Sequence, residues 1–178
     1  MFENIIKNVH NRHPLIHCIT NYVSINDCAN IVLACGGAPI MAEDINEVSQ
    51  ITSICQGLDI NIEMLNDNKL SSMLKAGATA NELGIPVILD PVGAGSSDYR
   101  IKAVQNLMSN VQFGVIRGNV SEIKAIAAKQ GIHNISAGVY DTMQKDKSAM
   151  GVEAGIADKI TDDNIKEMAD FINKLSQK

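Results

Sequence analysis

The chain has 178 residues, of which 46% are hydrophobic and 20% charged, and its formal net charge is −5. This composition excludes an intrinsically disordered chain, and we expect a single α/β domain over residues 1–178. Lys and Arg are scattered, and the longest apolar stretch, residues 31–42, contains two glycines and a proline. Neither nucleic-acid binding nor a membrane span therefore has support in the sequence.

The cellular compartment is indicated by the N-terminus and the cysteines. The first residues have neither the apolar core nor the cleavage site of a secretory signal. The four cysteines lack C-x-x-C spacing and have apolar neighbours, so we expect reduced core thiols rather than disulfides or a zinc site. They are Cys18, Cys28, Cys35 and Cys55. We therefore expect a cytoplasmic protein.

Short β-rich runs alternate with helical patterns along the chain, which is typical of βαβ units. This alternation predicts an α/β fold with a mostly parallel sheet flanked by helices. The predicted strands are residues 15–19, 39–41, 58–62, 87–90 and 115–117. The predicted helices are residues 23–34, 45–55, 69–83, 100–108 and 121–129. In the third predicted helix, four residues recur with a period of about 3.6 and therefore lie close to one face of the helix: Leu70, Leu74, Ala78 and Asn81.

The last part of the chain differs from this alternation. Residues 131–158 mix Gly, Ser, Asp and Lys without periodicity, so we expect a long functional or mobile excursion. A last helix is predicted from Thr161, its candidate N-cap, and an apolar stripe follows: Ile165, Met168, Ala169, Ile172 and Leu175. Such a helix normally leads to a further strand. On the pattern alone, a closing helix and a crossover without its strand are equally supported.

The segment D-P-V-G-A-G, residues 90–95, directly follows a predicted strand. A carboxylate at the carboxyl end of a parallel strand lies where open α/β sheets bind ligands, and glycines let backbone N–H groups approach an anion. The segment is neither a dinucleotide fingerprint, which has a third glycine, nor a Walker A loop, which has G-K-[ST]. A ligand-binding turn and an ordinary tight turn capped by Asp90 are equally supported by the spacing.

A second motif, V-I-R-G-N-V-S-E, covers residues 115–122. Asn119 and Glu122 have the N-x-x-E spacing of a capping box. Arg117 beside a helix start also suits an anion. With Asp90 on a nearby strand end, Glu122 could share one Mg²⁺, the usual ion for neutralising transferring phosphates. The residues alone favour the cap over the metal ligand, and the two roles are compatible.

Polar residues also end the first predicted strand. Thr20 and Asn21 precede a helix, so N-capping is the simplest interpretation, although the Asn21 amide could instead face a small ligand. His17 lies within the strand on an apolar face. We expect it to be a hydrogen-bonded core histidine rather than a catalyst.

Taken together, these segments resemble hydroxyethylthiazole kinases of the ribokinase-like superfamily. The resemblance runs in family order from Pro14 to about Asp158, through PLIHCITNYV, ANIVLACGGAPIMAE, KAGATANELGIPVILDPVGAGSSDYR and VIRGNVSEI. It implies ATP-dependent phosphorylation of the hydroxyl of 4-methyl-5-(2-hydroxyethyl)thiazole, in thiamine biosynthesis or salvage. Enzymes of this family form trimers with the thiazole pocket between subunits, so a homotrimer is the expected assembly. By position, the resemblance assigns Asn21 and Met41 to the thiazole site, Asp90 and Glu122 to Mg²⁺, and Arg117 and Asn119 to the nucleotide phosphates.

The sequence departs from the family pattern at its end. That pattern continues into a strand, a V-T-G turn and a G-T-G-C loop, which implies an anion hole and the residue nearest the substrate hydroxyl. These pieces are absent from the 178 residues, so no catalytic residue is assigned. We expect a C-terminally incomplete ribokinase-like fold that by itself lacks thiazole phosphorylation. The alternatives are a non-catalytic thiazole- or nucleotide-binding remnant of that kinase and an unstable fragment with an exposed sheet edge.

Overall fold

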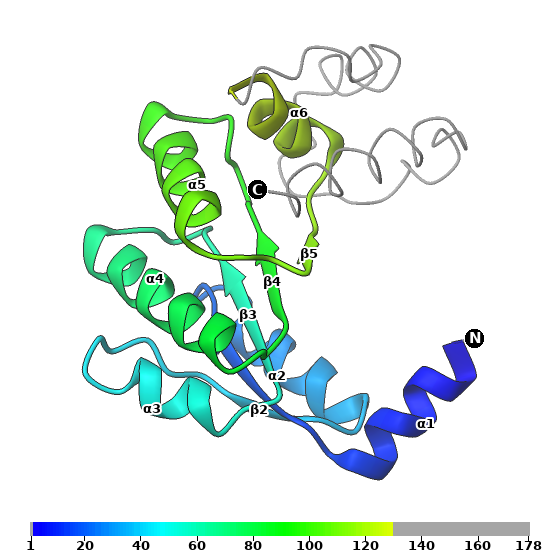
Figure 1. Cartoon of the computed structure of the whole chain (residues 1–178). Coiled ribbons are helices and arrows are strands. Elements are labelled where there is room, and N and C mark those ends of the chain that lie inside the picture. The colour runs from blue at the N-terminus through cyan, green and yellow to red at the C-terminus, as the bar shows by residue number, and fades with distance from the viewer. Residues whose placement is uncertain (1, 130–178) are drawn as a thin grey trace.

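A computed structural model describes residues 2–129, in which five strands alternate with helices (Figure 1). The strands are β1 (Leu15–Ile19), β2 (Ala38–Ile40), β3 (Gly57–Asn61), β4 (Val87–Asp90) and β5 (Val115–Ile116). The helices are α1 (Phe2–Arg12), α2 (Ile25–Ala34), α3 (Val48–Ser53), α4 (Asp67–Glu82), α5 (Asp98–Asn110) and α6 (Val120–Lys129). The predicted excursion and the predicted helix from Thr161 lie outside the described residues, so the single domain over residues 1–178 stays a prediction. Among the described helices, none is long and apolar enough to cross a membrane.

The five strands form one parallel sheet in the order β2-β1-β3-β4-β5, which confirms the predicted fold class. Ile60 of β3 is in register with Ile19 of β1 and with Leu89 of β4. Residues in register point to the same face of a sheet, and all three side chains are fully buried. This face of the sheet is therefore one wall of the hydrophobic core.

The strand order also fixes which helix covers which face. The chain moves from β1 to β2 in one direction and from β3 through β4 to β5 in the other. Since parallel crossovers are right-handed, α2 must lie on the opposite face from α4 and α5. Figure 1 shows α3, α4 and α5 side by side on one face of the sheet, and α4 contacts both of the others.

Helix α4 approaches its neighbours closely because small residues make up much of its buried face. The apolar residues of that face are Met73, Ala76, Gly77 and Ala80. This observed buried face is offset from the one predicted from the sequence. On the predicted face, Leu70 and Leu74 are only half-buried and Ala78 is exposed. A Cβ added at Gly77 would lie 2.5 Å from Val111 Cγ2, so the contact leaves no room for a larger side chain. Small residues thus give the tight packing that a core poor in aromatic residues needs.

Several details differ from the sequence predictions. Helix α1 was not predicted, because the alternating pattern specifies elements only from β1 onward. Strand β5 ends before Arg117, and α3 is shorter than expected because residues 44–47 form a turn. All four cysteines are free, but Cys35 is exposed and Cys28 is only half-buried. The prediction of core thiols is therefore wrong for Cys35, which follows α2 at its solvent-exposed end.

Candidate active site

All six residues predicted to form the site lie at the carboxyl edge of the sheet. Met41 follows β2, Asn21 follows β1 closely, Asp90 ends β4, Arg117 and Asn119 follow β5, and Glu122 lies in the first turn of α6. The strand order therefore places the predicted thiazole residues on one side of β3 and the predicted metal and nucleotide residues on the other. The connections that leave β1 and β3 run in opposite directions, so the ligand-binding switch point of the sheet lies between these two strands.

Asp90 and Arg117 form an ion pair at the ends of β4 and β5. Arg117 Nη1 lies 2.9 Å from Asp90 Oδ2, and the side chains are 59% and 15% exposed, respectively. Burial raises the pKa of Asp90 to about 6; the Arg117 guanidinium opposes this shift, and the Glu122 and Asp59 carboxylates add to it. The Asp90 carboxylate is thus poorly compensated by the protein, and a nearby cation would favour its ionised form.

Glu122 and Asn119 form the predicted capping box. Asn119 Oδ1 accepts a hydrogen bond from the Glu122 N–H at 3.0 Å, and Glu122 Oε2 accepts one from the Asn119 N–H at 2.8 Å. The other oxygen of Glu122 accepts a bond from the backbone N–H of Gly93, also at 3.0 Å. Gly93 has a φ of +66°, a conformation that favours glycine. Glu122 therefore holds the D-P-V-G-A-G turn against the start of α6.

The same turn is held from its other side by Arg100, a residue that the sequence analysis did not single out. Arg100 Nη1 donates to the carbonyl oxygens of Ile62 at 2.8 Å and Val92 at 3.0 Å, and Nη2 donates to that of Glu63. Arg100 therefore joins the end of β3 to the turn after β4. No local pattern distinguishes this arginine from the other basic residue of α5, Lys102, so the sequence holds no signal for its role.

The residues around Asp90 fit a magnesium ion whose coordination shell is completed by other groups. Mg²⁺ is usually held by one or two carboxylates together with water and phosphate oxygens. Within residues 2–129, no group of three or more His, Cys, Asp and Glu side chains could hold a metal. Glu122 is near enough to raise the pKa of Asp90, but both of its oxygens already accept backbone bonds. The donor set thus fits an ion held mainly by Asp90.

Asn21 is buried and uses its side chain in the turn before α2. Its Oδ1 accepts hydrogen bonds from the N–H groups of Val23 and Ser24, both at 2.9 Å, and its Nδ2 donates to the Ser24 hydroxyl. The N-cap of α2 is Ser24, so the prediction that Thr20 or Asn21 caps this helix is wrong in position. Among residues 2–129, the buried Thr20 Oγ1 has no hydrogen-bond partner. Since buried hydroxyls are normally paired, this end of β1 calls for one further polar partner.

His17 is a hydrogen-bonded core residue, as predicted. Its Nδ1 lies 2.9 Å from Thr52 Oγ1 and its Nε2 lies 2.8 Å from the Ala42 carbonyl oxygen. Burial lowers the pKa of His17, while the bond to Ala42 opposes the shift. The neutral ring therefore donates from Nε2 to Ala42 and fixes the residue after Met41.

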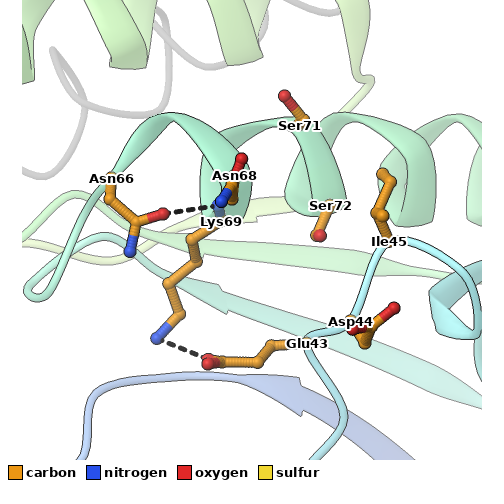
Figure 2. Close-up of a pocket in the computed structure, with 8 residues that line it drawn as sticks. All are labelled: Glu43, Asp44, Ile45, Asn66, Asn68, Lys69, Ser71 and Ser72. Atoms are coloured by element: carbon orange, nitrogen blue, oxygen red, sulfur yellow. Dashed lines mark hydrogen bonds and ion pairs between the residues drawn. The ribbon is translucent and has the colours of Figure 1, made fainter.

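A cavity of about 590 Å³ opens at the same edge, between the segment after β2 and the start of α4 (Figure 2). It is lined by Glu43, Asp44, Ile45, Asn66, Asn68, Lys69, Ser71 and Ser72. Lys69 Nζ lies 2.8 Å from Glu43 Oε2, and Asn66 caps α4 by accepting the Lys69 N–H. Neither Lys69 nor Glu43 was predicted from the sequence as a site residue, because nothing near either one indicates its partner.

Comparison with known proteins gives one family. A model of the hydroxyethylthiazole kinase family matches residues 6–162. The chain is 50% identical over all 178 residues to a hydroxyethylthiazole kinase of Clostridium acetobutylicum, and it spans 59% of that relative's length. A Methanobrevibacter smithii protein of the same name is 44% identical over 174 residues, which is 98% of this chain and 57% of the relative.

A solved structure leads to the same result. The structure of a hydroxyethylthiazole kinase from Pyrococcus horikoshii is similar to this chain with a TM-score of 0.70 and 39% sequence identity. The similarity covers 72% of this chain and 50% of that one. The resemblance noted in the sequence is therefore confirmed over most of the chain, which belongs to the hydroxyethylthiazole kinase family.

Proposed function

We propose that this chain forms the substrate and metal side of a kinase that transfers a phosphoryl group from ATP to the hydroxyl of 4-methyl-5-(2-hydroxyethyl)thiazole. The observation that carries the proposal is the division of the carboxyl edge. Asn21 and Met41 lie on the β1–β2 side, whereas Asp90 and Arg117 lie on the β4–β5 side. Strands β1 and β4 are two strand spacings apart, about 10 Å. An alcohol on one side and a phosphate on the other would therefore meet above β3.

The phosphate side suits a nucleotide because it combines a largely exposed guanidinium, the start of a helix and a carboxylate. The Arg117 guanidinium is largely exposed beside Asp90, and guanidinium groups bind phosphate oxygens with two parallel hydrogen bonds. Asn119 lies at the start of α6, where the helix dipole favours negative charge. Asp90, with Glu122 beside it, would hold Mg²⁺, which when bound neutralises charge on the transferring phosphates. The protein's own part is to fix the two substrates on opposite sides of β3.

We also propose a homotrimer, and the surface of α2 supports an assembly of copies. No residue of α2 is buried, although the helix is rich in apolar residues. Four large side chains of α2 and the preceding turn are more than half exposed: Tyr22, Val23, Ile31 and Leu33. Exposed apolar side chains gathered on one helix and its preceding turn favour a protein–protein contact. We place the protein in the cytoplasm, where ATP is available and free thiols persist.

The assembly proposal is tested by sedimentation of the 178-residue chain. We expect the mass of a trimer for the unaltered chain and a smaller mass for the double variant Ile31→Asp/Leu33→Asp. A monomer that behaves identically with and without the two substitutions would contradict the proposal.

The kinase proposal is tested in a chimera in which residues 1–178 replace the matching segment of the Clostridium acetobutylicum relative. We expect ATP-dependent formation of the phosphate ester of the thiazole alcohol, and loss of turnover when Asp90→Asn is introduced into the chimera. The unaltered relative is the control for assay conditions. A chimera that melts cooperatively but forms no phosphate ester would contradict the proposal.

A further inference from the structure

The most buried charge at the carboxyl edge belongs to Lys69, in the first turn of α4. Its side chain is 3% exposed, and its Nζ forms the ion pair with Glu43, whose side chain is 39% exposed (Figure 2). The Nζ also donates to the carbonyl oxygen of Thr20 and lies 4.8 Å from the centre of the Tyr22 ring. Lysine is rarely buried without partners, and here three groups from two other segments surround it.

These partners come from the segments that carry the proposed thiazole residues. Thr20 and Tyr22 flank Asn21, and Glu43 is two residues after Met41. The Tyr22 hydroxyl donates to Glu43, which closes a ring of contacts between the two segments.

The strand ladder does not fix these segments relative to each other. The register of β1 with β2 ends at the pair His17 and Ile40. Beyond it, the bonds that connect the segments of Asn21 and Met41 include those of Lys69 with Thr20 and Glu43 and that of His17 with Ala42. The Lys69–Glu43 pair thus lies beyond the end of the β1–β2 ladder, where backbone hydrogen bonds no longer set the distance between the two segments.

Stability alone is a weak reason for such a pair. Removing two charges from water costs about as much as their attraction returns, and apolar residues of similar volume often stabilise a fold equally well. An ion pair does, however, fix the direction and distance between the two side chains, because leaving either charge buried without its partner strongly destabilises the fold. We therefore attribute to this pair a role in setting the geometry of the two segments.

We infer that Lys69 and Glu43 are positioning residues that hold Asn21 and Met41 at the spacing needed to bind the thiazole alcohol. This inference rests on the proposed function, because it takes the thiazole alcohol as the ligand. Neither side chain is assigned to the reacting atoms, and both act through the two segments that they join.

The first test measures binding of the thiazole alcohol to the 178-residue chain by calorimetry, at a temperature where each variant is folded. Lys69→Met and Glu43→Gln are each expected to weaken binding about tenfold or more, the usual effect of losing a charge-assisted hydrogen bond. Lys102→Met, on the exposed side of α5, is the matched control and is expected to bind like the unaltered chain. If both site variants fold and bind with unchanged affinity, the inference is wrong.

The second test is amide hydrogen exchange without ligand, which separates positioning from a purely local role of Lys69 in α4. We expect faster exchange in residues 20–22 and 41–43 together, in either variant. Faster exchange confined to the first turn of α4 would overturn the inference. If Lys69→Met does not fold, Glu43→Gln still decides, because Glu43 is partly exposed. Failure of the unaltered chain to bind the alcohol would count against the proposed function, and the exchange pattern would still decide whether the pair fixes the two segments.

Discussion

Glu122 accepts a hydrogen bond from the backbone N–H of Gly93 at 3.0 Å, across a sequence separation of 29 residues. The same carboxylate accepts the N–H of Asn119, so one side chain serves both the turn after β4 and the start of α6. The two motifs that looked separate in the sequence are thus one structural unit. This unit carries Asp90 at one end and Asn119 at the other, and its hydrogen bonds connect the two ends of the phosphate side of the proposed site.

The double role of Glu122 predicts a loss of stability when its charge is removed. Glu122→Gln keeps only one acceptor oxygen, so one of the two N–H groups loses its partner. We expect the free energy of unfolding to fall by about 1–2 kcal/mol in urea denaturation. Glu82→Gln, at an exposed position of α4, is the control and should change little. Equal unfolding midpoints for the two variants would show that the bonds of Glu122 to Gly93 and Asn119 do not stabilise the fold.

The raised pKa of Asp90 predicts how stability depends on pH. Because the folded state holds this proton up to about pH 6, whereas the ordinary pKa of an aspartate is 3.8, ionisation is less favourable in the folded state. This group therefore lowers stability as the pH rises from about 4 to about 6, by about 2 kcal/mol. Asp90→Asn removes the titration, so the stability difference between variant and unaltered chain should shift in favour of the variant by that amount. Urea denaturation at several pH values measures it, and parallel pH profiles for the two proteins would refute the assignment.

Asn21 offers a way to separate a turn-forming role from ligand binding. Asn21→Asp keeps the oxygen that accepts the N–H groups of Val23 and Ser24 but loses the amide NH₂. We expect a lower melting temperature, because the new carboxylate lies in a buried position. We also expect the affinity of the folded variant for the thiazole alcohol to fall about tenfold, because one hydrogen-bond donor is lost and a charge is added. Thermal melting gives the first quantity, and calorimetry at a temperature where the variant is folded gives the second. If the folded variant binds the alcohol with unchanged affinity, Asn21 serves the turn alone.

The contact between Gly77 and Val111 predicts an unusual response to a helix-favouring substitution. Gly77→Ala would gain about 1 kcal/mol from helix propensity, but its Cβ would lie 2.5 Å from a methyl group of Val111. Overpacking of this kind costs about 1–3 kcal/mol, so we expect a net loss of stability. In a Val111→Ala background the same substitution should become neutral or stabilising. A stabilising effect in the unaltered chain would mean that Val111 moves aside at no cost.

The features that could be predicted from the sequence are those that a few neighbouring residues specify. The strands β1 and β4 have the predicted bounds, because apolar runs and turn residues define them locally. The capping box of Asn119 and Glu122 spans three positions, which the N-x-x-E pattern captures. The alternation of strands and helices predicts a parallel sheet, in which every strand ends at the same edge. This alone places all six candidate residues at that edge.

The features that could not be predicted are bonds between residues far apart in the chain. The contact from Lys69 to Thr20 spans 49 positions, and the contact from Arg100 to Ile62 spans 38. In each, a long basic side chain leaves a helix that looks amphipathic and reaches backbone carbonyls of another segment. A sequence pattern predicts the helix, but it does not predict which distant segment the longest side chains of that helix contact.

The division of the carboxyl edge into an alcohol side and a nucleotide side is tested most directly by the steady-state kinetics of the chimera. We predict that Asn21→Asp and Met41→Ala raise the KM for the thiazole alcohol and leave the KM for ATP within about twofold. Arg117→Ala and Asn119→Ala are expected to do the reverse. If substitutions on the β1–β2 side raise the KM for ATP, or those on the β4–β5 side raise the KM for the alcohol, the proposed arrangement of the two substrates across β3 is wrong.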